Sequence, residues 1–249
     1  MLAGVSVSLA FCVLGSGFAA AAPVTFFGED VNTSGDPNEA PFTNATNASN
    51  SFFNNLTGVG TETFESFPTG TSAPIPIGFM GAGTATINDG SIASGNDGLG
   101  RYPFSGTQYL NVGTDDFSIS FSNPIAALGF YGMDIGDFGG QLTLTLTDIN
   151  NVTSVLTVPN TIGENGSTSG SNLYFGFFDT GDTYTSVSFG NNSGGADVFA
   201  FDNFSIGSTA QVTPTIPEAS TWVMILAGFA GMGFVAYRKR GTKSALSAA

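Results

Sequence analysis

Residues 141–148 read QLTLTLTD, in which leucine and threonine alternate without interruption. The alternating residues are Leu142, Leu144 and Leu146 on one side and Thr143, Thr145 and Thr147 on the other. Successive side chains of a β-strand point to opposite faces, so this run predicts a strand with one apolar face and one wet face. Threonine is common on the wet face of ordinary strands, and an ice-facing or sugar-facing array is the alternative interpretation of the ladder.

Similar short β-type runs recur on both sides of this stretch. They cover residues 61–67, 84–87, 117–121, 125–131, 154–158, 173–178, 184–189 and 198–206. Turn-forming sequences such as Asn88-Asp89-Gly90 and Asn96-Asp97-Gly98 separate them. The pattern predicts an all-β domain over residues 61–208, built as a two-sheet antiparallel sandwich or jelly roll.

The segments that flank this domain lack the strand pattern. Residues 22–60 are predicted to form an irregular lead-in, with one helical turn over residues 48–56. Residues 209–216 contain Pro214 and are predicted to be a linker.

Composition excludes several kinds of chemistry. The 249 residues include no histidine and one cysteine, Cys12, so imidazole catalysis, histidine metal ligands and internal disulfides are excluded. Residues 22–216 contain 18 acidic residues against the single Arg101, a formal charge of −17. Because such a body repels phosphate backbones, nucleic acid is excluded as a partner.

The N-terminus has the pattern of a secretory signal peptide. A mostly apolar run over residues 5–18 is followed by small residues, and Ala19 and Ala21 satisfy the small-x-small rule. We expect signal peptidase to cut between Ala21 and Ala22, which removes residues 1–21 together with Cys12. The alternative is a buried helix of the domain.

The C-terminus has the pattern of a membrane stop. Residues 222–237 are sixteen residues without charge, with Trp222 and Tyr237 at the ends, followed by Arg238, Lys239 and Arg240. As a helix this segment would span roughly 24 Å, and the cations would stay on the cytoplasmic side. The alternative is a core helix that ends in a basic turn.

The order of these C-terminal features resembles the PEP-CTERM sorting signal of Gram-negative bacteria. Pro217 and Glu218 stand before Ser220-Thr221, the apolar segment and the three cations, so the resemblance covers residues 217–241 and leaves 242–249 as a cytoplasmic tail. Ile216 and Ala219 depart from the usual Val-Pro-Glu-Pro-Ser-Thr motif. The resemblance implies that an exosortase recognises Pro217-Glu218, that the inner membrane holds the precursor transiently, and that the product reaches the cell surface or an exopolysaccharide matrix.

The body also resembles uncharacterised exported PEP-CTERM β-sandwich proteins. Three stretches show this similarity: PVTFFGED at 23–30, GFYGMDIGDFGGQLTLTL at 129–146 and DVFAFDNFSIG at 197–207. The similarity implies a β-sandwich and no known activity.

The acidic residues suggest calcium as a candidate cofactor, because hard cations prefer carboxylate and carbonyl oxygens. Asp134-Ile-Gly-Asp137 and Asp179-Thr-Gly-Asp182 form two similar acidic turns. Asp202 resembles an acid in the closing strand of calcium-stabilised carbohydrate-binding jelly rolls, which implies pairing with Glu65. The alternative for Asp202 is a carboxylate that accepts backbone N–H groups at a strand bend. The predicted metal ligands are Glu65, Asp134, Asp137 and Asp202.

Three functions are compatible with these patterns. The leading one is a non-enzymatic envelope or matrix protein associated with exopolysaccharide, and the alternative is a carbohydrate-binding module, stabilised by calcium. A glycosidase ranks third, because no pair of carboxylates stands out from the spacing. Candidate aromatic residues for sugar stacking are Tyr102, Phe104, Tyr109 and Phe138.

Overall fold

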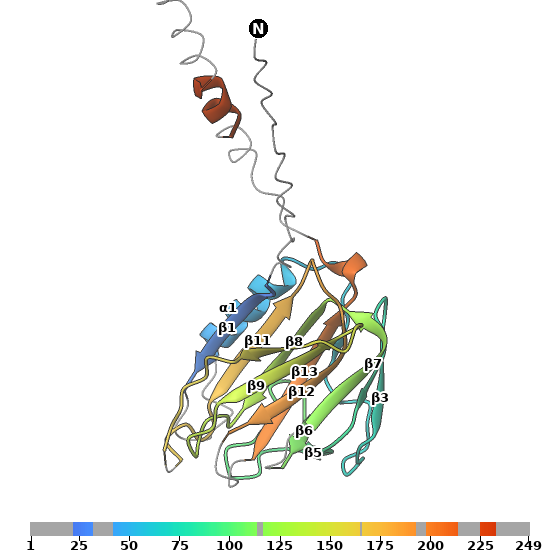
Figure 1. Ribbon diagram of the computed structural model, residues 1–249. Coiled ribbons are helices and arrows are strands. Elements are labelled where there is room, and N and C mark those ends of the chain that lie inside the picture. The colour runs from blue at the N-terminus through green and yellow to red at the C-terminus, as the bar shows by residue number, and fades with distance from the viewer. Residues whose placement is uncertain are drawn as a thin grey trace, which may run out of the picture.

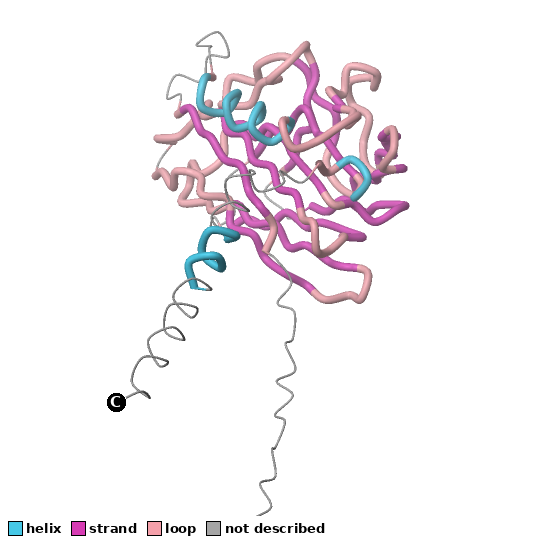
Figure 2. Tube along the Cα trace, turned by 90° about the horizontal axis from the view of Figure 1, so that it is seen from above, coloured by secondary structure: helices cyan, strands magenta, loops and turns pink. Residues whose placement is uncertain are grey.

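The computed structural model describes residues 22–31, 42–113, 117–164, 166–192, 198–213 and 225–232. Two antiparallel sheets lie face to face in this part of the chain, with one helix against an outer face (Figures 1 and 2). The predicted two-sheet sandwich is therefore confirmed for the described body.

The first sheet has the strand order β1-β11-β8-β13-β6-β5, and β2 pairs with the end of β13. Its strands are β1 (Val24–Asp30), β2 (Thr61–Glu62), β5 (Ser91–Ser94), β6 (Gln108–Val112), β8 (Ala127–Met133), β11 (Asn172–Phe178) and β13 (Phe199–Gly207). The strands at its two ends, β1 and β5, come from early parts of the chain.

The second sheet has the order β10-β9-β12-β7-β4-β3. Its strands are β3 (Ile75–Phe79), β4 (Gly83–Ile87), β7 (Phe117–Ile125), β9 (Leu142–Asp148), β10 (Thr153–Thr157) and β12 (Tyr184–Asn191). In β9 the three leucines are buried while Thr143, Thr145 and Thr147 are half-buried on the opposite face, as the alternation predicts.

Phenylalanine rings fill the space between the sheets. Phe130 lies 5.2 Å from Phe189 and 5.5 Å from Phe201 between ring centroids, and Phe117 stacks on Phe189 at 4.2 Å. These rings come from both sheets, so their burial joins the two layers and supplies the main hydrophobic stabilisation.

Residues 22–60 differ from the irregular lead-in that the sequence predicts. They contain the edge strand β1 and the helix α1 (Thr43–Phe53), which is longer than one turn and begins before residue 48. The Asp30 carboxylate accepts the backbone N–H groups of Asn44 at 3.1 Å and Ala45 at 2.9 Å. A residue from β1 therefore caps this helix, since its own N-cap residue, Phe42, makes no side-chain cap.

α1 packs on the outer face of β1 and β11 (Figure 1). Phe52 sits in a hollow above Gly129 and Gly176, where an added Cβ would approach the Phe52 ring to 2.9 Å at either glycine. Ala45 and Ala48 are buried on the same side of the helix. Small residues on both partners thus let the helix lie close to the sheet.

Two further boundaries differ from the predictions. In residues 61–67 only Thr61–Glu62 form a strand, because the chain turns at Phe64, whose φ is +62° and whose ring enters the core. The predicted linker begins later than residue 209, since η2 (Thr209–Gln211) continues the domain and Val212 bridges Leu56.

Most of the predicted sorting signals lie outside the described residues. This applies to Ala21, Pro217, Glu218, Trp222, Tyr237, Arg238, Lys239 and Arg240. Residues 225–232 are helical, and within the described part of the chain no helix is long and apolar enough to cross a membrane.

Candidate functional site

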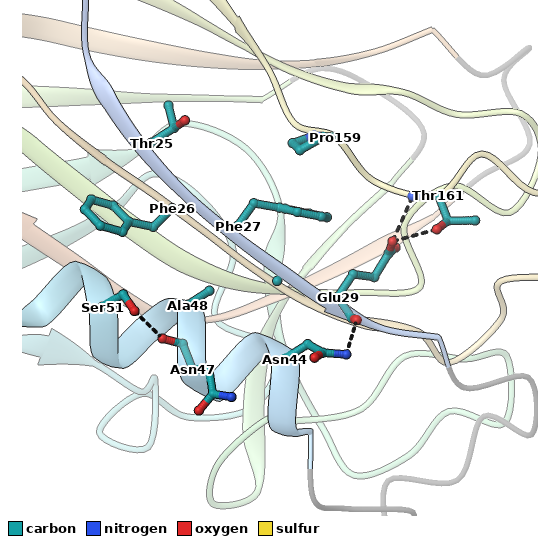
Figure 3. Close-up of a pocket in the computed structure, with 11 residues that line it drawn as sticks. Thr25, Phe26, Phe27, Glu29, Asn44, Asn47, Ala48, Ser51, Pro159 and Thr161 are labelled. Carbon is teal, nitrogen blue, oxygen red and sulfur yellow. Dashed lines mark hydrogen bonds between the residues drawn. The ribbon is translucent and has the colours of Figure 1, made fainter.

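An open groove of about 740 Å³ runs along β1, between α1 and the segment that follows β10 (Figure 3). Its lining residues are Thr25, Phe26, Phe27, Gly28, Glu29, Asn44, Asn47, Ala48, Ser51, Pro159 and Thr161. We call this feature the β1 groove. β1 is the edge strand of its sheet, so the groove lies on one side of the sandwich, where the chain leaves backbone and side chains accessible.

The alternation of β1 places one aromatic ring on each side of the strand. Phe26 faces α1, with its ring centroid 5.9 Å from that of Phe52 and 5.8 Å from that of Phe178. Phe27 points the other way and packs, half-buried, against the core between the sheets. Thr25 is exposed on the Phe27 side, so a hydroxyl and an aromatic ring lie together in the groove.

Glu29 closes one end of the β1 groove. Its Oε2 accepts the backbone N–H of Thr161 at 2.9 Å and the Thr161 hydroxyl at 2.7 Å, while its Oε1 is buried without a partner. Burial raises the pKa of Glu29, the hydrogen bonds from Thr161 oppose this rise, and the charge of Asp30 adds to it. The carboxylate therefore holds the segment after β10 against β1.

The α1 side of the groove is polar and uncharged. The Asn44 side-chain amide donates to the Glu29 carbonyl oxygen at 3.0 Å, which fixes the start of the helix to β1. Asn47 and Ser51 are exposed, and the Ser51 hydroxyl donates to the Asn47 carbonyl oxygen at 2.8 Å (Figure 3). The groove thus combines amides, hydroxyls, aromatic rings and a single lining acid.

Asp202, one of the predicted calcium ligands, is fully buried in β13. Its carboxylate accepts the backbone N–H of Ser105 at 2.9 Å and that of Asn203 at 2.7 Å. Burial raises the pKa of Asp202 to about 7 despite these hydrogen bonds. The arrangement matches the alternative interpretation of Asp202, a carboxylate that accepts N–H groups at a bend.

Glu65, the predicted partner of Asp202, is an exposed residue that holds the same loop from outside. It accepts the N–H groups of Thr107 and Gln108 at 2.8 and 2.7 Å, and the Thr107 hydroxyl at 2.9 Å. These hydrogen bonds lower the pKa of Glu65. The two acids therefore each satisfy their own backbone donors.

Asp134 and Asp137 are buried near the loop that precedes β11. Asp134 accepts the N–H of Gly170 at 3.1 Å, and Asp137 accepts the N–H and hydroxyl of Thr168 at 3.0 and 2.9 Å. Among the residues that the structure describes, no three acids or cysteines gather as a metal site would require. The four predicted ligands thus fall into two neighbourhoods, Glu65 with Asp202 at one loop and Asp134 with Asp137 at another.

Of the four aromatic residues predicted to stack on sugars, three pack within the domain and one is exposed. Tyr102 and Tyr109 are buried, and Phe104 stacks on Tyr131 at 3.5 Å between centroids, so these three belong to the packing around α1 and its neighbouring loop. Phe138 is 49% exposed. Sequence reasoning missed Phe27 and Thr25, because VTFFGED does not alternate apolar and polar residues and so gives no strand pattern.

No protein-family model and no curated protein matches the chain. Among solved structures, the CBM22-1 xylan-binding domain of Paenibacillus barcinonensis Xyn10C is 14% identical, with a TM-score of 0.37 over 64% of this chain and 96% of that domain. The C-terminal family 22 carbohydrate-binding module of Clostridium thermocellum Xyn10B is 16% identical, with a TM-score of 0.35 over 66% and 98%. The K2 cleaved adhesin domain of Lys-gingipain is 15% identical, with a TM-score of 0.35 over 59% and 97%. At such identities and TM-scores, these similarities assign no ligand or activity to this chain.

Proposed function

We propose that the protein is an exported, non-hydrolytic envelope or matrix protein whose body binds a neutral polysaccharide chain in the β1 groove. The observation that supports this most directly is the combination of Phe27, uncharged polar side chains and one carboxylate along an open groove. A groove that is open along its length can accept part of a long polymer, whereas an enclosed pocket would take only a small molecule.

The chemistry of the lining suits a polyhydroxylated ligand. Hydroxyl and amide groups both donate and accept hydrogen bonds, as sugar hydroxyls do. The C–H face of a sugar ring is apolar enough to lie against an aromatic ring such as Phe27. An anionic polymer is disfavoured, because the body has a formal charge of −17 and Arg101, its single cation, is paired with Asp97.

Hydrolysis is disfavoured by the same lining. Glycosidases need two carboxyl groups on opposite sides of the scissile bond, commonly about 5–10 Å apart. Glu29 is the single acid among the described lining residues, and one of its oxygens already accepts two hydrogen bonds from Thr161. The groove is therefore better suited to binding than to general acid and base chemistry.

The sequence signals supply the proposed location. Signal peptidase would cut between Ala21 and Ala22, and an exosortase would act at Pro217-Glu218 after Trp222–Tyr237 had entered the inner membrane. The processed body would then remain at the cell surface or in an exopolysaccharide matrix. A neutral polysaccharide of that matrix is the ligand to which the groove would be exposed.

The test is binding of soluble neutral oligosaccharides to the full-length protein. We expect isothermal titration calorimetry to detect binding of cellohexaose or xylohexaose, and Phe27→Leu to weaken it at least five-fold by removing the flat ring. Phe67→Leu is the matched control, because Phe67 is also half-buried against the main core but lies outside the groove. Thr25→Ala is a second groove variant at an exposed position.

Two results would overturn the proposal. One is the absence of heat of binding with both oligosaccharides and with a neutral glycan array. The other is equal binding by wild type, Phe27→Leu and Thr25→Ala. Release of reducing ends that stops in Glu29→Gln would instead establish hydrolysis.

A further inference from the structure

The outer face of the second sheet has a row of hydroxyl side chains that crosses its strands in register. Thr153 of β10 lies opposite Thr147 of β9, Thr147 opposite Ser186 of β12, and Ser186 opposite Ser120 of β7. Ser120 then lies opposite Thr86 of β4, and Thr86 opposite Pro76 of β3. We call the row Thr153, Thr147, Ser186, Ser120 and Thr86, together with its immediate neighbours, the hydroxyl face.

A second row repeats this chemistry two residues along the strands from β9 to β7, and its β10 position is Val155, which is 61% exposed. Thr145 of β9 pairs with Ser188 of β12, which pairs with Ser118 of β7. Neighbouring strands lie about 4.8 Å apart and every second residue advances about 6.7 Å, so the hydroxyls form a two-dimensional lattice. Asn88, also uncharged, donates its side-chain amide to Ser118 at 3.1 Å and Ser120 at 3.5 Å.

The two outer faces of the sandwich differ in how they are covered. α1 packs on the first sheet, and the loop around Ser105 lies over β13 of that sheet through the Asp202 carboxylate. On the second sheet, Ser120 and Ser188 are exposed, while Thr145, Thr147 and Ser186 are half-buried as expected of short side chains on a sheet surface. The hydroxyl face is therefore open to a ligand.

Charge separates this face from the rest of the body. Neither row contains an ionisable residue, although the body as a whole has a formal charge of −17. The nearest acids in sequence are Asp148, the last residue of β9, Asp116, just before β7, and Asp89, in the turn after β4. An extended, electrically neutral partner can therefore contact the two rows, which contain none of these acids.

The side chains also limit the class of partner. Serine and threonine hydroxyls both donate and accept, and short side chains lose little entropy when a ligand fixes them. A protein partner, including a second copy of this chain, would find neither the large aromatic side chains nor the arginines typical of interface centres in these rows. A partner that itself presents a flat, neutral array of hydroxyls could form hydrogen bonds with many of these serine and threonine side chains at once.

We propose that the hydroxyl face docks on the flat surface of an insoluble neutral polysaccharide, in which parallel chains present repeated hydroxyls. This site is separate from the β1 groove, which would bind a single soluble chain. The proposal does not depend on the groove, because the two surfaces share no residue.

The test is adsorption of the full-length protein to microcrystalline cellulose and to insoluble curdlan, both neutral glucans. We expect adsorption of wild type to at least one of them and a loss of at least ten-fold in affinity for Ser120→Glu, which places a charge in the middle of the row. Ser188→Glu is the second variant. Ser94→Glu is the matched control, because Ser94 is exposed on β5 of the other sheet and makes the same change in charge.

The outcomes separate this proposal from the groove. Phe27→Leu should adsorb like wild type while losing cellohexaose, and Ser120→Glu should retain cellohexaose. No adsorption of wild type to either glucan would overturn the proposal, as would equal adsorption by wild type, Ser120→Glu and Ser188→Glu with unchanged circular dichroism. Loss of adsorption in Phe27→Leu would assign the insoluble ligand to the groove and also overturn it. Self-association of wild type that Ser120→Glu abolishes, without adsorption, would make the face a contact between copies.

Discussion

Gly28 of β1 lies directly beneath Asn44 of α1: a Cβ added to Gly28 would stand 2.1 Å from the Asn44 carbonyl oxygen. The same Cβ would lie 2.5 Å from the Asn44 carbonyl carbon, so the obstacle is backbone that cannot rotate away. This close approach brings the Asp30 carboxylate within reach of the N–H groups that it caps. The absence of a side chain at Gly28 thus determines where α1 and one wall of the β1 groove lie.

We predict that Gly28→Ala destabilises the protein by about 1–3 kcal/mol, the usual cost of forcing an extra methyl group into a packed site. The helix must move away from β1, so the bonds from Asp30 and Asn44 weaken as well. Urea unfolding followed by circular dichroism measures the effect. Gly78→Ala is the matched control, because nothing lies within 4 Å of a Cβ at that strand position. Equal stability of the two variants would mean that α1 is not docked on Gly28.

The helix α1 shows which features of the fold the sequence could predict and which it could not. TNATNASNSFF is poor in strong helix formers, so local propensity gives little indication of an eleven-residue helix. Its stability comes from residues distant in sequence: Asp30 caps it, and Gly129 and Gly176 make room for Phe52. The buried residues Ala45, Ala48 and Phe52 do follow helical spacing, but two alanines and one ring among Asn, Ser and Thr make a weak apolar pattern.

The strands likewise include some that the sequence predicts and some that it does not. The alternation of leucine and threonine in β9 predicts its faces because every second residue is buried. β3, with the sequence IPIGF, was missed because proline and glycine are disfavoured in central strands, and the structure places it at a sheet edge, where proline is tolerated. The groove joins Glu29 to Thr161, which are 132 residues apart, and no spacing rule could have paired them.

The sorting signal allows a prediction about processing. We expect Glu218→Ala to insert into the membrane normally but to remain an uncut precursor, because the substitution removes the acid of the motif and leaves the apolar segment intact. The measurement is the mass and membrane fractionation of the protein in a host with the matching exosortase. Glu164→Ala makes the same change in charge within the body and should be processed like wild type. Unchanged processing of Glu218→Ala would leave a plain membrane anchor as the better interpretation of residues 217–241.

Asp202 gives the last prediction, a dependence of stability on pH. Its pKa is about 7 in the folded protein and 3.8 as the ordinary value. Between these values the folded state keeps a proton that the unfolded state has released, so the free energy of unfolding falls as pH rises from about 4 to 7 and levels off above. At about 1.4 kcal/mol for each pH unit, the fall is on the order of 4 kcal/mol.

We expect Asp202→Asn to flatten this fall, because the amide keeps an acceptor for the Ser105 N–H but cannot ionise. Urea unfolding at pH 4.5, 6 and 8 measures the slope. Asp148→Asn is the matched control: backbone hydrogen bonds lower the pKa of Asp148, so its contribution is lost only as pH falls below about 4, outside this window. A slope that survives in Asp202→Asn and not in Asp148→Asn would show that the buried carboxylate of β13 is not the group that titrates.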